Sequence, residues 1–197
     1  MGWYSHSKDL YNSLYASGGY YPQNAKFAWN SVIRNIKFNK ALDVGCGPGV
    51  AIKDMLDIGH GNITGIDIAS ELTHTWNKLG ISDRCVVAPA HKIPFADNEF
   101  DFVLCADCLE HIPVEGIDES FREMYRVCSG KAYFLISLVL ERTYKEGKEP
   151  LHCTLKQPEW WKSKIEKNGF RVVYDKTVKD AIMAVVAEAN KNYMEGE

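Results

Sequence analysis

Three alternating glycines follow an apolar run that ends in an acid, and this feature constrains the fold more than any other. The segment reads Ala41-Leu42-Asp43-Val44-Gly45-Cys46-Gly47-Pro48-Gly49. Alternating glycines let a backbone turn sharply off a strand and approach a ligand without an intervening side chain. Because residues 50–58 can form a helix, the ligand would lie at a helix N-terminus. The segment therefore predicts a strand, a ligand-binding turn and a helix.

A second acid, Asp67, ends the apolar run at residues 63–66. In nucleotide-binding βαβ units, an acid about 20 residues after the glycines accepts hydrogen bonds from ribose hydroxyls. A carboxylate suits this role because it offers only acceptor atoms. The alternative for Asp67 is a turn or helix-capping acid. A dinucleotide fingerprint would need its third glycine at position 50, where Val50 stands, so an NAD-dependent oxidoreductase is disfavoured.

From residue 40 onwards, candidate strands alternate with candidate helices. Strands are expected at 41–44, 63–68, 84–88, 100–106, 131–140, 170–176 and 182–188, and helices at 50–58, 71–79, 119–127 and 159–168. This alternation predicts a parallel sheet with helices on both faces. The short connection at 177–181 leaves no room for a crossover helix, so the last two strands should pair antiparallel. We expect an α/β, Rossmann-like, seven-stranded sheet, mostly parallel with an antiparallel last strand.

One domain is expected over residues 1–197, with an N-terminal helical lid over 1–38 and a Rossmann-like core over 39–197. The net charge of −3 and the lack of a dense Lys/Arg run make a nucleic-acid partner unexpected. No apolar run is long enough to span a bilayer, and the start lacks the apolar region of a signal peptide. We therefore expect a cytoplasmic protein without a membrane partner. Its oligomeric state stays open.

The glycine segment resembles the first motif of the class I S-adenosylmethionine (SAM)-dependent methyltransferases, of the small type 11/12-like kind. Two further segments carry the same resemblance: Ile93-Pro94-Phe95-Ala96-Asp97-Asn98-Glu99-Phe100-Asp101, and Asp107-Cys108-Leu109-Glu110-His111-Ile112. The resemblance covers about residues 38–190. It implies SAM as the cofactor, a small molecule as the methyl acceptor and methyl transfer as the activity. The alternative from another class is a SAM-binding regulatory or partner subunit without catalysis.

The resemblance also implies which residues hold the cofactor. The glycine turn would pass the methionine part, Asp67 would bind the ribose, and the segment after the third strand would hold the adenine. Asp107 would lie near the methionine amino group and Leu109 near the sulfonium. His91 could stack on the adenine or remain an exposed loop residue. The full predicted set is Tyr20, Tyr21, Asp43, Gly45, Cys46, Gly47, Gly49, Asp67, Ile68, Ala90, His91, Asp107 and Leu109.

Two histidines, His111 and His152, are the candidates for catalysis, because imidazole can take a proton from a hydroxyl near neutral pH. The resemblance implies that His111 faces the substrate pocket and that His152 lies in a loop at the catalytic edge of the sheet. We expect O-methylation of a small polar acceptor with a histidine base. The alternatives are a helix-start role for His111, satisfied by the backbone, and a surface-loop role for His152.

A metal-assisted O-methyltransferase would use the same region. The spacing Asp107-x-x-Glu110-His111, with the distant His152, resembles the E-x-x-E-H pattern and distant histidine of the small-RNA 2′-O-methyltransferases. Ubiquinone-pathway O-methyltransferases share the local pattern. The resemblance implies that these four residues hold a divalent ion that acidifies the acceptor hydroxyl. The Cys105-Ala106-Asp107-Cys108 segment has no second cysteine pair, so buried, reduced thiols are expected there.

Overall fold

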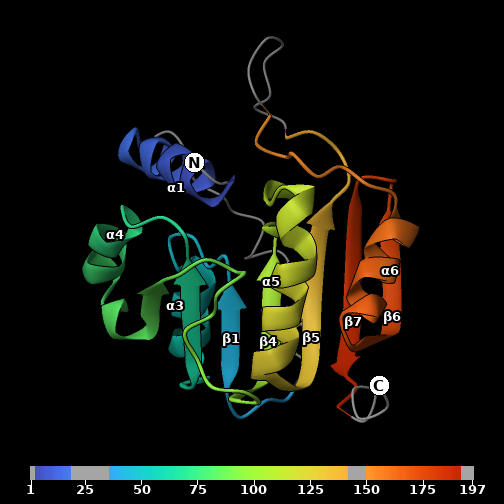
Figure 1. Cartoon of the computed structure of the whole chain (residues 1–197). Helices are drawn as coiled ribbons and strands as arrows, with labels where there is room; N and C mark the ends of the chain where they lie inside the picture. Colours follow the sequence, from blue (N-terminus) through green and yellow to red (C-terminus); the bar gives the residue numbers. More distant parts are fainter. Residues whose placement is uncertain (1–2, 19–35, 142–149, 192–197) are drawn as a thin grey trace.

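A computed structural model describes residues 3–18, 36–141 and 150–191. A seven-stranded sheet forms its centre, and helices cover both faces of that sheet (Figure 1). Two of the residues predicted to contact the cofactor, Tyr20 and Tyr21, lie outside the described residues, as does much of the predicted lid.

The sheet has the order β3-β2-β1-β4-β5-β7-β6. Its strands are β1 (Ala41–Val44), β2 (Ile63–Asp67), β3 (Cys85–Val87), β4 (Phe100–Ala106), β5 (Cys128–Ser137), β6 (Phe170–Val178) and β7 (Ile182–Ala189). The first five strands pair in parallel, and β7 pairs antiparallel with both β5 and β6. The prediction of a mostly parallel sheet with an antiparallel last strand is confirmed.

The helices that surround this sheet are α1 (Trp3–Ala16), α3 (Val50–Asp57), α4 (Leu72–Leu79), α5 (Val114–Val127) and α6 (Pro158–Lys167), with short 3-10 turns at Ser82–Arg84 and Leu109–His111. Helix α5 begins five residues before the predicted start at residue 119, directly after Pro113. Proline is favourable at a helix start, and Glu115 lies in the first turn, where an acid complements the helix dipole. Within the described residues, none of the helices combines the length and apolar character that a membrane crossing requires.

Two apolar layers hold the helices to the sheet, one on each face. Helices α5 and α6 pack on one face, where Phe121 meets the Phe134 ring edge-on at 5.3 Å and Trp161 is fully buried. Helices α3 and α4 pack on the other face through Ile52 and Trp76. Burying each such side chain stabilises the fold by roughly 1.5–3 kcal/mol. The sheet is therefore clamped from both sides.

Parallel pairing brings the carboxyl ends of β1 to β5 to one edge of the sheet, and α1 lies across that edge (Figure 1). Side-chain contacts with the segments after β2 and β4 hold α1 there. The side-chain oxygen of Asn12 accepts a hydrogen bond from the Glu71 amide at 3.2 Å, and the Tyr11 hydroxyl lies 2.7 Å from His111 Nδ1. Ligands of open α/β sheets bind beyond the carboxyl ends of the strands, so this edge is where a site is expected.

Candidate functional site

In the turn after β1, the space at Gly45 and at Gly49 is too small for a larger residue. Gly45, Gly47 and Gly49 have φ angles of 77°, 53° and 78°, all in the left-handed region. A Cβ at Gly45 would lie 2.5 Å from Cys108 Sγ, and one at Gly49 would collide with Ile81. The turn therefore needs glycine both for its backbone conformation and for its close approach to the segment after β4.

Hydrogen bonds from neighbouring elements fix this turn. The Gly47 amide donates to Asp67 Oδ2 at 2.9 Å, and Trp76 Nε1 donates to the Gly47 carbonyl at 2.9 Å. The amides of Gly45 and Cys46 both donate to the Ile66 carbonyl. Sequence reasoning missed Trp76, because its spacing on α4 is that of any core residue. These bonds hold the turn in one conformation before a ligand arrives.

Asp67 organises the turn and keeps acceptor capacity for a ligand. Its Oδ1 accepts from the Ala69 amide at 3.0 Å and its Oδ2 from Gly47, so each oxygen keeps a further lone pair. Burial raises the pKa of the Asp67 carboxyl to about 6. The turn-acid and ribose-acceptor roles considered for Asp67 are thus compatible, and the ribose role stays a prediction.

Asp43 lies buried in β1, next to the turn. Among the described residues, nothing donates a hydrogen bond to its Oδ2, and only 2% of the residue is exposed. Burial and the nearby Asp67 charge raise the pKa of Asp43 to about 7. Buried polar atoms normally have a partner, so this oxygen leaves room for a donor from outside the chain. Cys46, in contrast, packs among the core residues behind the turn and offers its backbone alone.

The loop after β3 carries the residues predicted to hold an adenine. Ala90 and His91 are both half-buried, and the Tyr4 ring of α1 meets His91 edge-on at 5.0 Å. Burial lowers the pKa of His91, which favours its neutral form. Arg126 holds the following residues by donating to the carbonyls of Ile93 and Phe95. Ile68, at the end of β2, is also half-buried.

The two candidate catalytic histidines, far apart in sequence, lie in contact. The rings of His111 and His152 are 4.6 Å apart and nearly perpendicular. Nδ1 of His111 lies 3.0 Å from the Leu151 carbonyl, and Nδ1 of His152 lies 2.6 Å from the Val139 carbonyl. A carbonyl can only accept, so we assign the ring proton to Nδ1 in both residues. At His111 the oxygen of the Tyr11 hydroxyl, 2.7 Å from Nδ1, then accepts from the same N–H. This tautomer leaves a lone pair on each Nε2.

Burial also sets the charge of His111. Burial and the neighbouring His152 lower the pKa of His111 to about 4, so His111 is neutral near pH 7. His152 is 7% exposed rather than a surface residue, and the Glu141 carboxylate accepts its backbone amide at 3.2 Å. Glu141 also accepts the Leu151 amide, a positioning role that sequence reasoning missed because Glu141 lies in a charged loop.

A buried carboxyl group completes the cluster. Glu110 is fully buried; its Oε1 accepts the Ser137 amide at 2.8 Å, while Oε2 has no hydrogen-bond partner among the described residues. Glu110, His111 and His152 each offer one ligand atom, and these atoms lie within 4.8 Å of one another. Burial and the adjacent Asp107 raise the pKa of Glu110 well above its usual range.

Two predicted residues after β4 are placed differently from one another. Asp107 is half-buried at a left-handed backbone position, φ 57°, at the edge where the ligand is expected. Leu109 is fully buried in the core formed with α5. Its contact with a cofactor therefore stays a prediction that this conformation does not display.

Cys105 is buried against Cys108. The pKa of its thiol is raised by their hydrogen bond and by burial, which disfavours a reactive thiolate.

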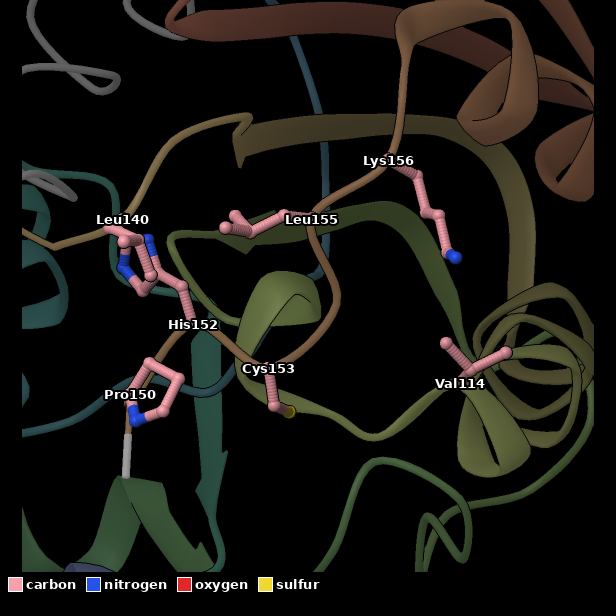
Figure 2. Close-up of a pocket in the computed structure, with 7 residues that line it drawn as sticks. All are labelled: Val114, Leu140, Pro150, His152, Cys153, Leu155 and Lys156. Atoms are coloured by element: carbon pink, nitrogen blue, oxygen red, sulfur yellow. The ribbon is translucent and has the colours of Figure 1, made fainter. Parts of the chain in front are cut away.

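A cavity of about 470 Å³ opens beside His152 (Figure 2). Its lining comes from the start of α5, the segment after β5 and the segment before α6, and consists of Val114, Leu140, Pro150, His152, Cys153, Leu155 and Lys156. His152 thus belongs both to the cavity wall and to the histidine pair. Sequence reasoning identified His152 but none of its neighbours here, because the lining residues come from separate segments that show no shared motif.

The chain is similar in sequence to known proteins. The methyltransferase domain family matches residues 42–136. A sterol 4-C-methyltransferase of Caenorhabditis elegans is 32% identical over 126 residues, which are 60% of this chain and 37% of that protein. A ubiquinone biosynthesis O-methyltransferase of Hydrogenovibrio crunogenus is 35% identical over 86 residues, 41% of this chain and 35% of that protein. The chain thus spans little more than a third of the length of these two relatives.

Solved structures share the fold at low sequence identity. A magnesium protoporphyrin IX methyltransferase of Synechocystis, with bound S-adenosylhomocysteine (SAH), has a TM-score of 0.69 and 13% identity, covering 93% of this chain and 98% of that one. A SAM-dependent methyltransferase of Aquifex aeolicus has a TM-score of 0.60 and 21% identity, covering 84% of this chain and 89% of that one.

Proposed function

We propose, on the premise that this chain belongs to the class I SAM-dependent methyltransferases, that it transfers a methyl group from SAM to a hydroxyl group of a small molecule. The family resemblance found in the sequence is confirmed, and SAM is the cofactor. The observation that carries the O-methylation proposal is the buried contact between His111 and His152, each with Nδ1 facing a carbonyl. Such a pair is a base poised for a hydroxyl proton.

The residues around the glycine turn fit SAM. The turn leaves the backbone bare, Asp43 has an acceptor atom without a partner, and Asp67 keeps two free lone pairs beside it. Carboxyl groups also suit a cofactor that carries positive charge. We assign the cofactor to Asp43, the glycine turn, Asp67 and Asp107, with Ala90 and His91 on the adenine side. When bound, SAM supplies an electrophilic methyl carbon on a sulfonium.

The chain's own residues then orient the acceptor and remove its proton. Neutral His111 would accept a hydroxyl proton at Nε2, while its Nδ1 is held by Leu151 and Tyr11. His152 would orient the acceptor from the cavity side. General-base catalysis of this kind contributes about 10²–10⁴ in rate, and holding the acceptor in line contributes further. The relatives named for C-methylation of sterols are the reason that the acceptor atom needs a direct test.

Two measurements test the proposal. Calorimetric titration should show binding of SAH and none of NAD, and tight NAD binding alone would contradict the cofactor assignment. Radiolabelled methyl transfer to candidate hydroxyl compounds should then fall about 10²–10⁴-fold in His111→Ala, with SAH affinity nearly unchanged. His74→Ala, on the exposed side of α4, is the matched control. SAH binding without any methyl transfer would instead favour a regulatory subunit.

A metal-assisted reaction is the second candidate, and one observation favours it. Glu110 Oε2 has no partner among the described residues, and it lies in the cluster that His111 and His152 complete. Two imidazoles with one carboxylate suit Zn²⁺, Mn²⁺ or Fe²⁺ better than Mg²⁺. These ions would take the lone pairs of the histidines and acidify the acceptor hydroxyl directly.

Equilibrium dialysis separates the two mechanisms. Under the metal-assisted mechanism, Zn²⁺ or Mn²⁺ should bind one equivalent per chain, Glu110→Gln should abolish that binding, and chelation should stop turnover until the ion is restored. Under the histidine-base mechanism, chelation leaves turnover unchanged. Glu119→Gln, an exposed position on α5, is the control for the loss of a carboxylate.

We also place the protein in the cytoplasm, a proposal supported by its six free cysteines.

A further inference from the structure

We infer that the cavity beside His152 binds an amphipathic acid: the methyl acceptor has an apolar body and an anionic group in addition to its reacting hydroxyl. This inference rests on the proposed function, because it places the acceptor next to His152. It differs from the small polar acceptor that the sequence suggested. The cavity, of about 470 Å³, is large enough for a small organic molecule.

The apolar body is indicated by the side chains of the wall. Val114, Leu140, Pro150 and Leu155 contribute four apolar residues to a lining of seven. Val114 is 41% exposed and Leu140 is 42% exposed, which is unusual for large aliphatic side chains that face a shared hollow. Concave apolar surfaces of this kind mark binding sites, since a ligand that covers them removes apolar area from water.

The anionic group is indicated by Lys156. Its ammonium group makes no ion pair within the described part of the chain, and it lies 5.8 Å from the Trp160 ring centroid. In Figure 2 the Lys156 side chain extends toward Val114, at the opposite end of the lining from His152. A cation beside an apolar wall binds a ligand that carries both an apolar portion and a negative charge.

His152 connects this cavity to the reacting centre. Its ring touches His111 on one side, and the residue also belongs to the cavity lining. Glu141 is the acid next to this segment, and its carboxylate accepts hydrogen bonds from the backbone amides of Leu151 and His152. The reacting hydroxyl of a bound molecule would therefore lie at the His152 end of the cavity, and its anionic group at the Lys156 end.

The charge preference is tested with three probes of equal length: octanoate, octanol and octylamine. Their affinities for the SAH-bound protein would be measured by ligand-observed NMR titration. Octanoate should bind more tightly than octanol, and octylamine most weakly. Lys156→Gln should weaken the binding of octanoate by about fivefold, which is the upper end of the effect of an exposed ion pair. The affinity for octanol should stay unchanged. Lys78→Gln, on α4, is the matched control.

The location is tested with an acid placed in the wall. Val114→Asp adds a negative charge in the first turn of α5, where acids are well tolerated, so the variant should fold. Because its carboxylate offsets the charge of Lys156, it should remove the preference for octanoate over octylamine. Val173→Asp has the same chemistry and the same 41% exposure on β6 and should leave the preference unchanged.

The inference is overturned if octanoate and octylamine bind equally well, or if a preference for octanoate survives both Lys156→Gln and Val114→Asp. Failure to detect any probe at millimolar concentration would also count against it. The SAH titration keeps the two proposals separate. SAH binding without a probe preference rejects the amphipathic acceptor alone. A probe preference in a protein that binds no SAH rejects the methyltransferase activity and leaves the cavity's ligand class standing.

Discussion

At the scale of single residues, Gly45 is where one added methyl group should have the largest effect. Gly45→Ala would place a Cβ 2.5 Å from Cys108 Sγ at a φ of 77°. We expect a loss of about 2–4 kcal/mol in the free energy of unfolding, from backbone strain and overpacking together. Urea denaturation measures this change, and SAH affinity should fall in the same variant.

The control is Gly80→Ala, at a φ of 67° with no atom within 4 Å of the added Cβ. It carries the conformational cost alone, about 1 kcal/mol. Equal losses at the two positions would mean that contact with Cys108 is not what requires glycine at position 45.

Asp43 should make the stability of the ligand-free protein depend on pH. Its folded-state pKa, about 7, is above the ordinary value of 3.8, so the folded state holds a proton that the unfolded state has released. The contribution of this bound proton to the free energy of unfolding is therefore fully present below about pH 4. It is lost as pH rises through about 7. An asparagine at this position does not titrate, so Asp43→Asn does not lose stability in this way. Between pH 4 and pH 8, the free energy of unfolding of the variant should therefore rise by about 2–4 kcal/mol relative to that of the wild type.

Urea unfolding of both proteins at several pH values measures the difference. Asp83→Asn, at a side chain that is 73% exposed, shows what the substitution does outside the core. A constant difference between Asp43→Asn and wild type across this range would mean that Asp43 does not hold a proton in the folded state.

The candidate site was predictable from sequence to the extent that it depends on local motifs. The glycine turn and Asp67 were recognisable because their roles follow from backbone conformation and spacing along one βαβ unit. The bond from Trp76 to Gly47 and the contact of Cys108 with Gly45 join separate segments. Their residue types are common in any core, so only the folded structure reveals them.

At the scale of elements, α1 reaches the histidine pair through Tyr11. Its hydroxyl lies 2.7 Å from His111 Nδ1, and the two rings meet at 90°. Tyr11 is a positioning residue, so Tyr11→Phe should lower kcat about three- to tenfold and leave SAH affinity unchanged. Tyr15→Phe, on the same helix, is the control. A change in SAH affinity without a change in kcat would place Tyr11 at the cofactor instead.

Helix α5 holds the loop after β3 through Arg126 and through Glu123, whose carboxylate accepts the Ile93 amide at 2.8 Å. Arg126 donates to the carbonyls of Ile93 and Phe95 and pairs with Asp97 and Glu123. A lysine cannot reproduce this fork. Arg126→Lys should therefore speed amide hydrogen exchange across residues 93–99 and lower stability by about 1–2 kcal/mol.

Hydrogen exchange read by mass spectrometry locates the effect. Arg122→Lys, exposed on the same helix, is the control. Exchange that stays slow in the loop of Arg126→Lys would show that apolar packing, rather than the guanidinium, holds these residues.

At the scale of the whole molecule, the strand and helix alternation was sufficient to predict the sheet and its two covered faces. Boundaries were less accurate. Strand β5 runs over Cys128–Ser137 rather than 131–140, because it follows α5 directly with no loop between them. Periodicity along the chain cannot specify where the last strand inserts. That position depends on long-range pairing, which the short connection at 177–181 only partly indicates.

The place of β7 has a consequence for how the protein is synthesised. β7 (Ile182–Ala189) is the last strand of this sheet in chain order, yet it lies between β5 and β6 in the finished sheet. Until it emerges, one edge of β5 lacks its partner strand and β6 has no neighbour to pair with. While residues 138–189 are being synthesised, the nascent chain therefore carries an unpaired strand edge on β5. Protection by a ribosome-associated chaperone would matter more for this chain than for one whose last strand lies at the rim.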